Sequence, residues 1–366
     1  MAATDVQAVG RARPWAHWRG RLAGRGARAG ALIPALVVLL LAAVVVNIGV
    51  GAVAISPPQA AAILLAHAGV ETGIDYSPQQ DAVLWAIRLP RVLLALLVGA
   101  GLGLAGASLQ GVFRNPLAEP ALIGVSSGAS VGAVAPIVFW FTLLGRASLP
   151  LAAFAGALLT TLLVYATSRS EGRTPVETLI LMGIAVNAVA GALTGYLTFL
   201  ADDQQLRSIV FWSLGSLGGA TWEVVKAVLP FIGVGLLLTP RWGRALNLLV
   251  LGEREARHLG LNTERTRFVL IALAALMTGA AVAVAGIIGF VGLVVPHLVR
   301  LIAGPDHRLL LPASALGGAL LLLLADLAAR TLVTPAELPL GVVTALLGGP
   351  FFMWLLYRAK RMRVDF

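Results

Sequence analysis

The chain contains no cysteine and few charged residues. Of its 366 residues only 12% are Asp, Glu, Lys or Arg, whereas 58% are hydrophobic. The absence of cysteine excludes disulfides, thiolate catalysis and Cys-ligated metals. The scarcity of charge, with a mean hydropathy of +0.90, lies far outside the composition of soluble domains. The composition therefore predicts a membrane protein.

Apolar runs of membrane length make up most of the chain. Ten such runs, separated by polar residues, Pro or Gly, are of a length that spans a bilayer as helix. They lie near 31–54, 91–113, 121–143, 149–167, 177–200, 223–239, 267–285, 287–303, 309–329 and 338–357. We therefore predict an all-α polytopic membrane protein. Residues 31–358 would form one ten-helix domain, between a basic tail at 1–30 and a second tail at 359–366.

Positive charge gathers on one side of this arrangement. The net charge of +10 would suit nucleic-acid binding, but all except six of the 27 Lys and Arg residues fall in segments on the same side as the N-terminus. An excess of Lys and Arg marks the cytoplasmic side of a membrane protein. We therefore predict cytoplasmic termini and no nucleic-acid partner. The length of the first apolar run favours a retained span over a cleaved signal peptide.

The two halves of the chain resemble each other. Residues 99–106 (G-A-G-L-G-L-A-G) match residues 279–286 (G-A-A-V-A-V-A-G) at an offset of 180, and Pro116 aligns with Pro296. Five predicted spans lie in each half, and an odd number inverts the second half across the membrane. Inverted repeats are typical of transporters, whose pathway lies between the halves.

The longest inner connection covers residues 241–266. Its charges alternate, and the pattern predicts a helix over Glu253 to Leu259, between Gly252 and Gly260. The apolar residues that would offer a contact to a soluble protein are Leu251, Ala256 and Leu259. On the outer side, the sequence predicts a surface helix from about Pro58 to Ala68 and a short aromatic helix from Ile209 to Leu217.

The chain has no phosphate-binding loop of the form G-x-x-x-x-G-K-[ST]. This loop requires a lysine directly after glycine, and neither Lys226 nor Lys360 has that neighbour. If ATP drives the protein, hydrolysis must occur on another polypeptide.

Motifs spread along the chain in a fixed order carry a family resemblance. They are R-L-P-R at 88–91, Q-G-V-F-R-N-P-L-A-E-P at 110–120, G-V-S-S-G-A at 124–129, G-F-V-G-L-V-V-P-H-L-V-R at 289–300, G-P-D-H-R at 304–308 and A-E-L-P-L-G-V-V-T-A-L-L-G-G-P-F-F at 336–352. Over roughly 31–360 the chain resembles the permeases of iron-chelate and cobalamin ABC importers. The resemblance implies ten helices per subunit, a homodimer in the bacterial inner membrane, two cytoplasmic ATPase subunits and a periplasmic binding protein.

The resemblance also assigns residues to two contact surfaces. Arg88, Arg91 and Arg330 match arginines that dock the binding protein, where a bidentate guanidinium suits an acidic partner. Simple snorkelling of arginines at a membrane end is the alternative. The helix that couples the permease to its ATPase would comprise Gly252, Glu253, Ala256, Arg257, Leu259 and Gly260.

A gate and a translocation path follow from the same resemblance. Val176 and Glu177 fall where the family places its cytoplasmic gate, although relatives often carry small hydroxyl residues at the position of Glu177. The polar candidates for the path are Asn187, Thr194, Tyr196, Thr198 and Ser213. Hydrogen bonds in helix packing explain many such residues equally well.

The segment at 200–222 looks most like the haem-importing branch of the family, with ferric-siderophore and cobalamin permeases as alternatives. The side chains of a type that ligates haem iron are His67, Met182, Tyr196, His297 and His307. A path that must release its cargo should bind it weakly. We therefore predict no strong axial ligand, no resident metal and no permanently bound cofactor.

Two other classes of function remain open. An ion-coupled secondary transporter usually needs carboxylates within the membrane; Asp326 is almost the only candidate, and its spacing predicts a pair with Arg330 one turn later. A membrane-embedded enzyme would need a nucleophile–base pair or a metal cluster, and the spans contain neither pattern. We therefore expect a transport subunit and not an enzyme.

Overall fold

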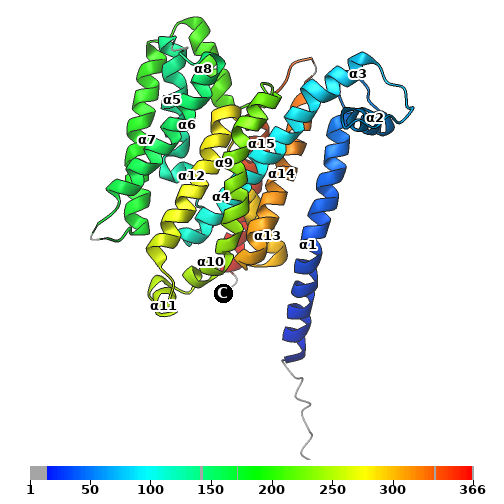
Figure 1. The fold of residues 1–366 in the computed structure, drawn as a ribbon. Coiled ribbons are helices and arrows are strands. Elements are labelled where there is room, and N and C mark those ends of the chain that lie inside the picture. The colour runs from blue at the N-terminus through cyan, green and yellow to red at the C-terminus, as the bar shows by residue number, and fades with distance from the viewer. Residues whose placement is uncertain (1–14, 141–142, 171, 334, 365–366) are drawn as a thin grey trace, which may run out of the picture.

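The computed structural model describes residues 15–140, 143–170, 172–333 and 335–364, and all regular elements in these ranges are helices (Figure 1). The predicted all-α class is confirmed. One helix lies at each predicted span: α1 (Trp15–Gly49), α4 (Leu89–Val112), α5 (Val125–Phe139), α6 (Ser148–Thr167), α7 (Val176–Phe199), α9 (Trp222–Leu238), α12 (Thr263–Ala285), α13 (Val291–Ala303), α14 (His307–Thr331) and α15 (Leu340–Val364).

Not all of these helices have the length of a full span. In the described residues, seven helical stretches are long and apolar enough to cross a membrane, whereas α5, α13 and residues 340–355 of α15 are shorter. The helix α1 begins at Trp15, inside the predicted basic tail, but its candidate span starts at Gly30. The tail at 1–30 is therefore partly helical, and its residues 1–14 lie outside the described part.

Short helices cap the two ends of the bundle. At one end lie α2 (Pro57–His67), α3 (Pro78–Ala82), a π-helical turn η1 (Val83–Arg88) and α8 (Asp203–Leu214), and at the other lie α10 (Gly243–Val250) and α11 (Glu253–His258) (Figure 1). Three 3₁₀ turns complete the described fold: η2 (Pro120–Ile123), η3 (Gly145–Ala147) and η4 (Thr239–Trp242). The predicted helices near 58–68 and 253–259 are confirmed, and α10 is an element that the sequence reading missed.

The aromatic helix α8 begins six residues earlier than predicted. The side chain of Asp202 accepts hydrogen bonds from the backbone N–H groups of Gln204 and Gln205, and the Gln205 side chain accepts one from the Asp202 N–H. This capping box fixes the start of the helix within a polar stretch. The prediction missed this start because it relied on apolar residues. The helix ends before Gly215, whose φ of 72° interrupts it.

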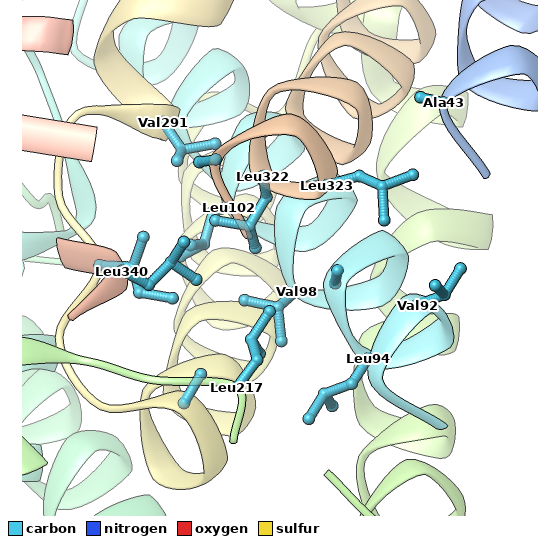
Figure 2. Packing of buried hydrophobic residues seen from close by; sticks show 14 of the residues in the cluster. Ala43, Val92, Leu94, Val98, Leu102, Leu217, Val291, Leu322, Leu323 and Leu340 are labelled. Atoms are coloured by element: carbon cyan, nitrogen blue, oxygen red, sulfur yellow. The ribbon is translucent and has the colours of Figure 1, made fainter. Parts of the chain in front are cut away.

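Helix α4 lies at the centre of the fold, and its small residues permit close packing. A Cβ added to Gly99 would lie 2.4 Å from the carbonyl oxygen of Gly318, and one added to Gly106 would lie 2.0 Å from that of Gly292. Glycine therefore lets the backbones of α14 and α13 approach α4 directly. Figure 2 shows the buried aliphatic cluster around α4, with Val98 among its labelled members.

The predicted repeat agrees with the fold only in part. Helices α4 and α12, which carry the matching glycine segments, run in opposite directions (Figure 1), as inversion of one half requires. The proline match does not extend to the structure, because Pro116 lies in the connection after α4 whereas Pro296 lies inside α13.

Candidate functional site

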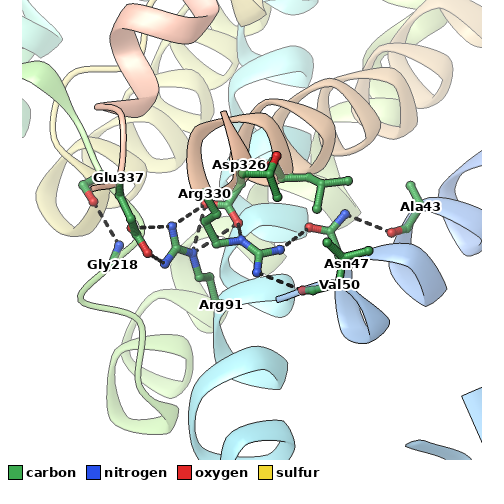
Figure 3. A network of polar contacts seen from close by, with 11 residues as sticks. Ala43, Asn47, Val50, Arg91, Gly218, Asp326, Arg330 and Glu337 are labelled. Atoms are coloured by element: carbon green, nitrogen blue, oxygen red, sulfur yellow. Dashed lines mark hydrogen bonds and ion pairs between the residues drawn. The ribbon is translucent and has the colours of Figure 1, made fainter. Parts of the chain in front are cut away.

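The three predicted docking arginines lie together at the end of the bundle that carries α2 and α3. With two carboxylates they form what we call the outer charge cluster, which comprises Arg88, Arg91, Asp326, Arg330 and Glu337. Figure 3 shows the last four of these residues. These residues line a cavity of about 270 Å³ together with residues of α1 and of the connection after it. The structure therefore brings together residues from three separate parts of the sequence.

Arg88 is buried and holds the end of α1. Its Nη1 donates hydrogen bonds to the carbonyl oxygens of Ile48 (2.5 Å) and Gly49 (3.2 Å), and its Nη2 donates one to Val53 (2.5 Å). The last carbonyls of a helix have no partner within the helix, and a cation there satisfies them. Only 5% of the residue is exposed, so Arg88 has a structural role that the sequence reading did not identify.

Arg91 is bound by two carboxylates. Its Nη1 and Nη2 each lie 2.9 Å from an oxygen of Glu337, and its Nε lies 3.0 Å from Oδ1 of Asp326. Asp326 also pairs with Nε of Arg330 at 3.2 Å, which confirms the pair predicted from the four-residue spacing. The Arg91 guanidinium holds the pKa of the Glu337 carboxyl below its usual range.

A second cluster lies at the opposite end, around α11. This inner charge cluster comprises Glu253 and Arg257 of α11 with Glu264 and Arg267 of α12. Arg267 is only 4% exposed, and its Nη1 donates to Oε1 of Glu264 at 2.8 Å and to the carbonyl oxygen of Thr174 at 2.6 Å. Burial opposes ionisation of Glu253, but Arg267 and Arg257 outweigh it and hold the pKa of Glu253 below its usual value.

Exposed apolar side chains lie just before and just after α11. Leu251 is 60% exposed and Leu259 is 61% exposed. Ala256, which the sequence reading assigned to the same contact, is fully buried within the protein's own core. Gly252 and Gly260 both have positive φ, and they set the two turns that bound α11.

The predicted gate residues lie at the first turn of α7, next to the inner charge cluster. Val176 and Glu177 line a cavity of about 280 Å³ together with Glu253, Arg257 and Arg267. Glu177 is exposed. The structure thus places the start of α7 beside the predicted coupling helix.

The polar residues predicted for the path are engaged mainly within their own or neighbouring helices. Asn187 donates to the carbonyl oxygen of Ala121 at 2.9 Å and accepts from the Ser127 hydroxyl at 2.5 Å, so it ties α7 to η2 and α5. The hydroxyls of Thr194, Thr198 and Ser213 each donate to a carbonyl oxygen three or four residues earlier. Tyr196, in contrast, is 61% exposed on α7.

The side chains that match haem ligands in type lie in different environments. His67 stacks on Trp85 with ring centroids 3.8 Å apart, and His307 contacts Oδ1 of Asn247 through Nδ1 at 2.9 Å. His297 lies edge-on to Phe351. Met182 packs against the core. Among the described residues, no group of three His, Asp or Glu side chains has the arrangement of a metal site.

Comparison with known proteins assigns the family. Residues 39–358 match the FecCD transport family. The chain belongs to this family. HmuU of Yersinia pestis, a hemin transport system permease protein, is 50% identical over 284 residues, which are 76% of this chain and 84% of that protein. BtuC of Halobacterium salinarum, a cobalamin import system permease protein, is 45% identical over 296 residues, 81% of this chain and 78% of that protein.

A solved structure supports the same assignment. A metal-chelate-type ABC transporter in an inward-facing conformation superposes with a TM-score of 0.79 at 35% sequence identity, covering 90% of this chain and 99% of that chain. The resemblance to permeases of iron-chelate and cobalamin importers is therefore confirmed, and this FecCD-family chain is a multi-pass transport permease.

Two residues that the sequence reading did not single out, Glu337 and Arg267, occupy central places in the two charge clusters. Sequence carried no signal for the contact of Glu337 with Arg91, 246 positions away, or for that of Arg267 with Thr174, 93 positions away.

Proposed function

We propose that the chain is the membrane-spanning permease subunit of an ATP-driven importer that takes haem from a periplasmic binding protein and passes it to the cytoplasm. The path would lie at the interface between two copies of the chain. The higher identity to a hemin permease, 50% against 45% for a cobalamin permease, supports haem as cargo. Cobalamin is the second candidate, because BtuC proteins match a larger share of this chain. A ferric siderophore is the third.

The proposal includes the topology predicted from charge. All ten apolar helices would cross the inner membrane in two inverted halves of five, with both termini in the cytoplasm. The opposite placement of α2, α3 and α8 on one side and of α10 and α11 on the other supports it (Figure 1). The shorter helices α5 and α13 would cross with help from the turns that flank them, since backbone that is buried in protein does not need full helical length.

The outer charge cluster would receive the binding protein. Its three arginines and two carboxylates leave one net positive charge at the end of α4 and α14. Such a surface attracts an acidic partner, and attraction between charges mainly raises the rate at which the two proteins meet. Arg91 and Arg330 would supply this attraction, whereas Arg88 mainly supports α1.

The opposite end would bind two ATPase subunits, one for each copy of the permease. The exposed Leu251 and Leu259 flank α11, and apolar side chains at the rim of a charged helix fit insertion into a cleft of a soluble partner. Val176 and Glu177 would form the gate beside it. ATP would be bound by the partner and not by this chain.

An ion-coupled mechanism receives little support from Asp326. This carboxylate is 2% exposed and is paired with both Arg91 and Arg330. Both ion-pair partners of this carboxylate are arginines of the chain itself, so it is already engaged and is not a free site for a coupling ion. An energy source on another subunit therefore fits the chain better.

The test is uptake into vesicles that contain the permease, its ATPase and its binding protein. We expect haem uptake to require ATP and the binding protein. Uptake that follows a proton or sodium gradient without ATP would contradict the proposal. Absorbance titration of the binding protein with haem, a ferric siderophore and cobalamin separates the three cargoes, and saturable binding of cobalamin alone would replace haem in the proposal.

A further inference from the structure

The inner charge cluster connects α11 to the segment that precedes α7. Glu253 is the first residue of α11, and its Oε2 lies 3.3 Å from Nη2 of Arg267 in α12. The same guanidinium donates through Nη1 to the carbonyl oxygen of Thr174 at 2.6 Å. Thr174 lies two residues before α7, and Pro175 is the N-cap of that helix. One side chain therefore contacts both α11 and the entrance to α7.

Glu264 strengthens this connection. Its Oε1 accepts from Nη1 of Arg267 at 2.8 Å and also from the backbone N–H of Thr174 at 3.2 Å. The peptide groups on both sides of Thr174 are therefore held by the same ion pair. Thr174 is itself fully buried. The segment cannot shift relative to α12 without breaking charge-assisted hydrogen bonds, which are stronger than neutral ones.

A second set of contacts holds α11 to the same helix. Arg257 donates through Nε to the Thr263 hydroxyl at 3.1 Å and through Nη2 to Glu253. Ala256 of the same helix is fully buried and belongs to the hydrophobic core. Since Glu253 and Arg257 both hold α11 to α12, a displacement of α11 must also displace the Glu253 carboxylate that contacts Arg267.

We propose that Arg267 transmits the movement of α11, driven by the ATPase, to the amino-terminal end of α7. The inference rests on the proposed function and adds a named residue to it. Arg267 is buried, so a partner protein does not contact it directly. Its planar fork contacts three oxygen partners from two separate nitrogens, Thr174 and Glu264 through Nη1 and Glu253 through Nη2, whereas a lysine would offer one nitrogen on a flexible stem. Arg267 acts through other residues and does not touch the cargo, so it is a positioning residue.

The test compares uptake with ATP hydrolysis in vesicles that contain the whole complex. In Arg267→Gln the link from α11 to Thr174 is broken, and we expect uptake to fall at least about fivefold further than ATP hydrolysis, the scale of a modest coupling energy. In Arg267→Lys the ratio of uptake to ATP hydrolysis should lie between that of Arg267→Gln and that of the parent. Arg265→Gln is the matched control, because Arg265 lies on the same turn of α12 but is exposed, and it should keep the parental ratio.

A second readout follows the start of α7 directly. The chain contains no cysteine, so Arg173→Cys introduces a single attachment point for a spin label beside Thr174. We expect ATP to change the spectrum of this label in the parent complex and in Arg265→Gln, but not in Arg267→Gln. A purely structural role for Arg267 would not remove the response to ATP while the complex still hydrolyses it.

Equal losses of uptake and hydrolysis in the Arg267 variants, or no loss at all, would overturn the proposal. A complex that fails to assemble in both Arg267 variants also contradicts it, because Arg267 would then hold α11 in place and transmit nothing. If the parent complex shows no ATP-dependent uptake, the proposed function itself fails. That outcome differs from failure of the Arg267 proposal alone, in which the parent takes up haem and the Arg267 variants keep the parental ratio of uptake to ATP hydrolysis.

Discussion

Arg91 of α4 and Asp326 of α14 form an ion pair across 235 positions of sequence, with Nε of the arginine 3.0 Å from Oδ1 of the carboxylate (Figure 3). The pair joins the central helix to one of its main packing partners near the end of the bundle. Asp326 is 2% exposed, and it forms an ion pair with Arg330 as well. The carboxylate therefore joins Arg330, its predicted partner one turn later, to Arg91, whose contact no spacing along the chain predicts.

The first prediction concerns stability. Asp326→Asn removes the shared counter-charge of two largely buried arginines, and breaking a buried pair from one side costs about 3 kcal/mol. We expect a clearly lower unfolding temperature for the variant purified in detergent. Glu337→Gln is the control, because Glu337 is 46% exposed and should have a much smaller effect. Equal losses in the two variants would argue against a central role for Asp326.

The second prediction separates docking from stability. Arg330→Gln lowers the positive charge of the outer charge cluster, whereas Glu337→Gln raises it, and both variants lose contacts. If an acidic binding protein docks here, the first variant should bind it more weakly and the second more tightly, each by about threefold to tenfold at low salt. Surface plasmon resonance on permease in nanodiscs measures both affinities. Changes of the same sign would indicate loss of structure instead of loss of attraction.

The third prediction is a pH dependence. The pKa of Glu337 lies below its ordinary value of 4.5 because Arg91 stabilises the ionised form. A lowered pKa means that the stabilisation is fully present above pH 4.5 and is lost as the pH falls through the lower, folded-state value. The difference in unfolding temperature between the parent and Glu337→Gln should therefore be constant at neutral pH and vanish in strong acid. A difference that grows with acidity would contradict this assignment.

The fourth prediction tests the close approach at the centre of the fold. Gly106→Ala places a methyl group where α13 passes, 2.0 Å from the Gly292 carbonyl oxygen. Overpacking of this kind costs about 1–3 kcal/mol, so the unfolding temperature should fall. Gly233→Ala in α9 is the control, because a Cβ there meets nothing within 4 Å. It should be neutral or slightly stabilising, since alanine favours helix over glycine.

Features whose signal is local in the sequence were predicted correctly, whereas contacts between distant residues were not. Hydrophobic runs located the ten helices, and a spacing of four residues gave the pair of Asp326 with Arg330. The start of α8 was missed, since a capping box made of Asp202 and Gln205 contains no apolar residue. The role of Arg88 was missed because the carbonyls that it caps lie about 40 residues earlier, at the end of α1. Only the fold reveals such partners.

The last prediction distinguishes two of the three apolar residues that the sequence placed on one contact surface, Leu259 and Ala256. Leu259→Ser should weaken retention of the ATPase subunits without lowering the unfolding temperature, because the side chain is 61% exposed in the permease. Ala256→Ser is the counterpart, since Ala256 is fully buried; a hydroxyl there should lower stability by about 1–2 kcal/mol and affect the ATPase only through that loss. Co-purification measures retention, and thermal unfolding measures stability. If Leu259→Ser retains the ATPase fully, the flank of α11 is not the contact.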